Sequence, residues 1–144
     1  MKKISNALIS VPLRGVTFNF RAPTASELPE LMALQERLKP ASGTPGLRDV
    51  ALMNAVQLGL LWEAGHGQVE DVGALDASAY RPPEGISAPP EALRLFGELV
   101  LAELSEAGVG FGDLQVLAIH VTREMMGTTA IQEAVKAADF TGRR

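Results

Sequence analysis

The chain has 144 residues, contains no cysteine and carries a formal net charge of −4 at pH 7. This length corresponds to one ordinary domain, and the lack of cysteine excludes disulfides, thiolate zinc sites and cysteine nucleophiles. The acidic balance argues against a nucleic-acid surface, which needs clustered positive charge. No apolar run approaches the ~20 residues of a membrane span. Hydrophobic residues make up 47% of the chain but aromatic residues only 5%, as is typical of a helical core.

The first predicted element is a β-hairpin over about residues 8–21, closed by a two-residue loop at Arg14 and Gly15. Because side chains alternate along a strand, this register places six apolar side chains on one face, in the pairs Leu13–Val16, Val11–Phe18 and Ile9–Phe20. Pro12 falls in a non-hydrogen-bonded pair opposite Thr17, so the first strand should form an outer edge. A lone hairpin is marginal in water, so helices should cover its apolar face.

Two helices are predicted in the first half of the chain, over residues 26–39 and 47–64. Ser26 is the favoured N-cap of the first, because it places Pro29 at the third position, where the missing donor costs little. Thr24 is the alternative cap, through a capping box. The second helix is apolar on nearly all sides, so we expect it to be central and covered by its neighbours.

Residues 68–90 are predicted to be a proline-rich connector, which we interpret as an excursion within a single domain over residues 1–144. A helix over residues 91–107 follows, started by Ser87 and the prolines after it. Gly108 is expected to be the residue that ends this helix.

Two further helices are predicted over residues 113–126, capped by Asp113, and 129–139. Several β-branched residues in 113–126 leave a strand as the alternative there. Together the elements predict a mainly α protein, a small helical domain with an N-terminal two-stranded β-hairpin.

The sequence GVGFGD over residues 108–113 superficially resembles a phosphate-binding glycine loop. It follows a predicted helix instead of a strand, and it lacks the lysine and the serine or threonine of a P-loop. Glycines that end one helix in a tight helix–helix turn explain it better.

The other polar residues do not form a recognisable metal-binding or catalytic site in the sequence. His66 and His120 have no second ligand at zinc spacing. Glu98, Glu103 and Glu106 are expected on the solvated side of their helix, where acid–base work is disfavoured. We therefore expect no catalytic, cofactor-binding or metal-binding residue, and a protein that is not an enzyme.

Some apolar residues lie outside the main helical stripes: Leu52, Leu58, Trp62, Leu95 and Leu101. They are explained either by neighbouring helices that cover them or by a surface that accepts an apolar peptide or helix. Under the second explanation Trp62, Leu58 and Leu95 are the candidate partner-binding residues.

Two segments carry a family resemblance. GVTFNFRAPTASELPELMAL (residues 15–34) runs from an extended segment into a capped helix, and LFGELVLAELSEAGVGFGDLQVLA (residues 95–118) has the form helix, glycine turn, helix. Together they resemble the small tail assembly chaperones of long-tailed bacteriophages and related prophages. This resemblance implies a helical protein of the host cytoplasm, without catalytic residues or cofactors. It also implies a protein client, the tape-measure protein, kept soluble until tail-tube subunits polymerise around it.

Two other classes of function stay open. A structural or connector component of a phage tail or related particle would use the hairpin edge to extend a neighbour's sheet. A small ligand-binding domain or enzyme would need polar groups that converge in a pocket. We expect no nucleic-acid or membrane partner, and the sequence leaves a homo-oligomer open.

Overall fold

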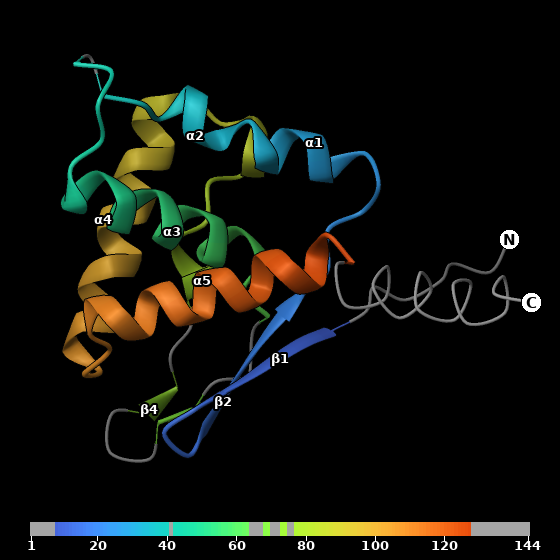
Figure 1. Cartoon of the computed structure of the whole chain (residues 1–144), viewed down its shortest axis with the longest axis vertical. Helices are drawn as coiled ribbons and strands as arrows, with labels where there is room; N and C mark the ends of the chain where they lie inside the picture. The colour runs from blue at the N-terminus through green and yellow to red at the C-terminus, as the bar shows by residue number, and fades with distance from the viewer. Residues whose placement is uncertain (1–7, 41, 64–67, 70–72, 75–76, 128–144) are drawn as a thin grey trace, which may run out of the picture.

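The computed structural model describes residues 8–40, 42–63, 68–69, 73–74 and 77–127 (Figure 1). Its helices are α1 (Glu27–Met32), α2 (Leu34–Arg37), α3 (Leu47–Leu61), α4 (Pro90–Glu106) and α5 (Phe111–Met125), with 3₁₀ turns η1 (Ala77–Tyr80) and η2 (Gly85–Ser87). Its strands are β1 (Leu8–Leu13), β2 (Val16–Arg21), β3 (Gln68–Val69) and β4 (Gly73–Ala74). The predicted mainly α fold with an N-terminal β-hairpin is confirmed. The helix predicted over 129–139 lies outside the described residues.

The β1–β2 hairpin has the predicted register: Leu13 lies opposite Val16, Val11 opposite Phe18 and Ile9 opposite Phe20. Arg14 and Gly15 both have positive φ, 46° and 83°, as a two-residue type I′ turn requires. The predicted inward face is buried at Ile9, Val11, Phe18 and Phe20. Local turn chemistry and side-chain alternation therefore determine this element.

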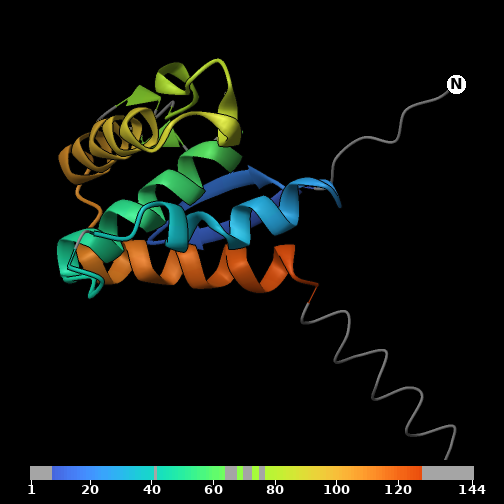
Figure 2. The ribbon, with the colours of Figure 1, turned by 90° about the horizontal axis from the view of Figure 1, so that it is seen from above.

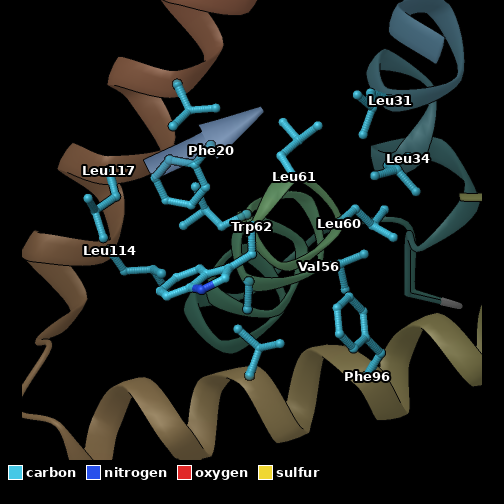
Figure 3. Packing of buried hydrophobic residues seen from close by; sticks show 14 of the residues in the cluster. Phe20, Leu31, Leu34, Val56, Leu60, Leu61, Trp62, Phe96, Leu114 and Leu117 are labelled. Atoms are coloured by element: carbon cyan, nitrogen blue, oxygen red, sulfur yellow. The ribbon is translucent and has the colours of Figure 1, made fainter. Parts of the chain in front are cut away.

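Trp62 joins the hairpin to the end of α3. It forms a β-bridge with Phe20, and the next N–H, of Glu63, donates to the Asn19 carbonyl at 3.1 Å. The indole packs edge-to-face on Phe18 and Phe20, with ring centroids 5.7 and 5.5 Å away. Figure 3 shows Trp62 beside Phe20. Because Trp62 takes an extended backbone (φ −57°, ψ 130°), α3 ends at Leu61 and not at residue 64 as predicted.

The helix predicted over 26–39 is divided into α1 and α2 at Ala33 (φ −81°, ψ −7°). Ser26 is the N-cap position, as favoured, but its side chain makes no capping bond. Glu27 instead accepts a bond from the Thr24 N–H at 2.9 Å and pairs with Arg21 at 2.7 Å. The carboxylate of Glu27 thus secures the start of α1 and ties it to β2.

The predicted connector 68–90 contains the short antiparallel strand pair β3 and β4 and the turns η1 and η2. Arg81 fastens it to the domain, because its Nη2 donates to the carbonyls of Gly59 at 3.0 Å and Trp62 at 2.7 Å. These carbonyls belong to the C-terminal end of α3, where a cation is favourable. Helix α4 then begins at Pro90, with Pro89 and not Ser87 as its N-cap.

A tight turn joins α4 to α5. Gly108 has φ 90°, its N–H donates to the Ser105 carbonyl at 3.0 Å, and the Val109 N–H donates to the Leu104 carbonyl at 2.9 Å. This is a Schellman motif, so interpreting GVGFGD as a helix–helix turn is confirmed. The prediction that Asp113 is the N-cap of the next helix is wrong, because α5 begins at Phe111 and Asp113 is its third residue.

Helix α3 lies between α4 and α5, as Figure 2 shows from above, and its central position was expected. The approach of α4 is close at two glycines. A Cβ built on Gly59 would lie 2.6 Å from Phe96 Cζ, and one on Gly97 would lie 2.7 Å from Val56 Cγ2 and 3.2 Å from the Leu52 carbonyl oxygen. Both glycines are buried within helices, so their helix-weakening effect is offset by the packing that they allow.

We expect Gly97→Ala to lower the free energy of unfolding by about 1–3 kcal/mol, because the new methyl group overpacks α3 against α4. Gly112→Ala is the matched control, since a Cβ at this helical glycine meets nothing within 4 Å. That control should leave stability unchanged or raise it by up to about 1 kcal/mol. Urea unfolding of both variants checks this; equal midpoints would contradict the close packing.

Trp62→Ala should lower the free energy of unfolding by about 3–5 kcal/mol, because a large buried aromatic group is removed. Leu95→Ala, at a side chain that is 63% exposed, should change it by less than about 1 kcal/mol. A soluble, fully stable Trp62→Ala protein would show that the indole is not part of the core.

The Arg21–Glu27 pair predicts a pH dependence. The hydrogen bond from Arg21 lowers the pKa of Glu27 to about 2, so the pair stabilises the fold above the unfolded pKa and is lost as pH falls below about 4. With partial solvent screening we expect a contribution of about 2 kcal/mol at neutral pH. The stability difference between wild type and Glu27→Gln should shrink toward acid pH, whereas Glu30→Gln should show little difference at any pH. A pH-independent difference for Glu27→Gln would contradict the assignment.

Candidate binding groove

An apolar groove of about 470 Å³ lies where the start of α3, the second half of α4 and the start of α5 meet. These three ends gather at the left of Figure 1. The α4–α5 turn places the last turns of α4 beside the first turn of α5. The groove is lined by Leu47, Arg48, Ala51, Glu98, Leu101, Ala102, Leu104, Ser105, Val109, Gly110, Phe111 and Leu114. Its volume is in the range of ordinary ligand-binding sites.

Two exposed apolar side chains stand at the mouth of the groove, and each is the first residue of a helix. Leu47 begins α3 and is 74% exposed, and Phe111 begins α5 and is 43% exposed. Both helices start with the same local pattern, a glycine N-cap and an aspartate at the third position. The carboxylates of Asp49 and Asp113 accept the N-cap N–H at 2.8 and 2.9 Å. Since these bonds secure the helix starts, Leu47 and Phe111 are not needed for capping.

Few polar groups line the groove. Arg48 Nη2 lies 2.5 Å from Glu98 Oε2, and this exposed ion pair joins α3 to α4. Ser105 is the other polar side chain of the lining. At the α4–α5 turn, next to the groove, Arg14 of the hairpin turn donates to Asp113 at 2.7 Å and to the Gly108 carbonyl at 3.0 Å. The surface therefore presents mainly aliphatic and aromatic groups.

The three predicted partner-binding residues separate into two environments. Trp62 and Leu58 are 2% and 0% exposed, so neither offers surface to a partner, and the expectation for these two residues is corrected: the hairpin and neighbouring helices cover them. Leu95 does lie on the surface. With Leu99, 40% exposed, and Ala102 it forms one stripe of α4 at i, i+4 and i+7. Ala102 also lines the groove, so this α4 stripe continues the groove outward.

A smaller cavity of about 150 Å³ is lined by two arginines and two glutamates among apolar side chains: Arg21, Glu27, Leu31, Leu60, Leu61, Arg81, Glu84, Gly85 and Ile86. Arg21 and Glu27 make two hydrogen bonds to each other, and Arg81 binds the end of α3. Bonds that hold the fold together therefore already engage Arg21, Glu27 and Arg81.

The other polar residues considered in the sequence as metal ligands or catalytic groups do not come together in the described structure. His120 is exposed on α5, and His66 lies outside the described residues. Glu103 departs from the expected solvation, because its Oε2 is buried without a hydrogen-bond partner in the described part of the chain. Among the described residues, no three His, Asp or Glu side chains gather as metal ligands. No helix in that part has the length and apolar character needed to cross a bilayer.

The sequence reasoning missed the groove. Leu47 and Phe111 stand outside the buried stripes of their helices, so periodicity assigns them no role. One local signal was present, the repeated order glycine, apolar residue, any residue, aspartate in GLRD and GFGD. Comparison of the chain with protein-family models, with curated proteins and with solved structures finds no match.

Proposed function

We propose that this protein is a non-enzymatic, chaperone-like assembly factor that binds an apolar helical segment of another protein. The observation that carries the proposal is the apolar groove with exposed Leu47 and Phe111 at its mouth and the α4 stripe beside it. Contiguous exposed apolar surface on a small protein is typical of interaction sites.

A helix is the occupant that fits this surface best. Helices that bind in grooves anchor apolar side chains at i, i+3, i+4 and i+7 along one face. The groove and the α4 stripe together form an elongated apolar surface and not a closed cavity with converging polar groups. An elongated surface of this kind suits a segment of chain more than a compact metabolite.

The family resemblance supplies the client class. A tape-measure protein of a phage tail is long and helical, and its apolar segments need cover until the tail tube forms. Each apolar client side chain that leaves water on the groove contributes about 1.5–3 kcal/mol. The net negative charge of the chaperone keeps the complex dispersed. The host cytoplasm would be the place of action.

A structural role in the particle is the second candidate, favoured by the hairpin. Within the described residues, the backbone contacts that widen this sheet come from the β2 side, through Trp62 and Glu63. In this role the outer edge of β1 would pair with a neighbour's strand. Purified particles separate the two roles: a structural component is retained in them, whereas a chaperone is absent.

Co-expression with the tape-measure protein encoded in the same genome tests the proposal. The protein should raise the soluble fraction of this client, and the double variant Leu47→Ser/Phe111→Ser should abolish the increase while its unfolding midpoint stays near that of wild type. The matched control is Val116→Ser/Ile119→Ser, which changes two side chains of α5 that are each 53% exposed and lie outside the groove. If both double variants protect the client as well as wild type does, the groove is not the binding surface.

A further inference from the structure

The second half of α4 carries an unfavourable arrangement of charge. Glu98, Glu103 and Glu106 lie there, and the last turn has no basic residue. The C-terminal end of a helix is the negative end of its dipole, so acidic side chains are disfavoured there and basic ones are stabilising. Helix stability therefore does not explain this charge, whereas a positively charged partner would.

Two of these carboxylates, Glu98 and Glu106, lie beside the apolar groove, whereas Glu103 is not among its lining residues and has a buried Oε2. Glu98 lines it directly, and Glu106 follows Ala102, another lining residue, by one helical turn. Among the lining residues that the structure describes, Arg48 is the one cation, and it is already paired with Glu98 at 2.5 Å. The apolar floor is thus bordered by two carboxylates, Glu98 and Glu106, and one guanidinium, Arg48, which together form an acidic rim with one net negative charge.

We infer that the occupant of the groove is a cationic amphipathic helix, apolar on one face and flanked by lysine or arginine. This inference rests on the proposed helix-binding function and adds the charge of the client. The apolar face of such a helix contacts Leu47, Leu101 and Phe111, while its basic side chains lie near Glu98 and Glu106. Arg48 competes with the client for Glu98, so the ion pair acts against binding.

Three synthetic helical peptides with the same apolar positions test this, with lysine, glutamine or glutamate at the flanking positions. Binding to the full-length protein is measured by fluorescence anisotropy. The lysine peptide should bind at least about tenfold more tightly than the glutamate peptide, because like charges across an interface are costly. The difference should shrink in high salt, which screens exposed charges.

Variants that each remove one charge test whether the residues of the acidic rim contribute to peptide binding. Glu106→Gln should weaken binding of the lysine peptide by about threefold, whereas Arg48→Gln should strengthen it because Glu98 is released. Glu30→Gln is the matched control: Glu30 is an exposed carboxylate on α1, which Figure 1 shows on the opposite side of the molecule from the groove. This control should leave the affinity unchanged, and urea unfolding confirms that all three variants are folded.

The outcomes separate the two levels of the proposal. Equal affinity for the lysine and glutamine peptides, or weaker binding by Arg48→Gln, overturns the inference about charge and leaves helix binding intact. Failure of all three peptides and of the tape-measure client overturns the proposed function itself. Self-association of the protein that Leu47→Ser/Phe111→Ser abolishes would assign the groove to a second copy of this chain, and it would likewise overturn the inference.

Discussion

The close approach of α3 and α4 is the contact on which the other elements depend. It needs Gly59 in one helix and Gly97 in the other, because a methyl group at either position would collide with the facing helix. With the two helices this close, Phe96 and Val100 fill the space beside Gly59, and α3 is left free to contact α5 and the hairpin on its other sides. The wall that α3 and α4 share in the groove is set by the same approach. The lack of a side chain at Gly59 and Gly97 thus sets how close the two helices lie, and with it the position of the exposed apolar surface.

The predictable parts of the fold were those with local causes. Two residues with positive φ and strict alternation determine the register of the hairpin, and the glycines after α4 determine its end. The termination of α3 was not predictable in this way, because Trp62 leaves the helix to pair with Phe20, which is 42 positions earlier in the chain. The division of the first helix at Ala33 has no comparable signal in the sequence.

The groove was harder to predict than the fold, for a physical reason. Counting apolar residues outside a helical stripe shows that something must cover them, but it does not show whether the cover is the protein itself or a partner. Trp62 and Leu58 are covered internally, while Leu95 is not. Leu47 and Phe111 became recognisable only when the start of α3 was placed beside the α4–α5 turn, which comes much later in the chain. The composition predicted exposed apolar residues, but two of the three that were named, Leu58 and Trp62, are buried.

The turn between α4 and α5, which forms one end of the groove, is held from outside by the hairpin. Arg14, the one non-glycine residue with positive φ in the described part of the chain, donates both to the Gly108 carbonyl in the turn and to Asp113 in the first turn of α5. The turn therefore cannot shift without either drawing the hairpin tip with it or breaking both bonds. The Arg14 guanidinium thus adds to the packing of β1 on α5 in coupling the N-terminal sheet to the apolar surface.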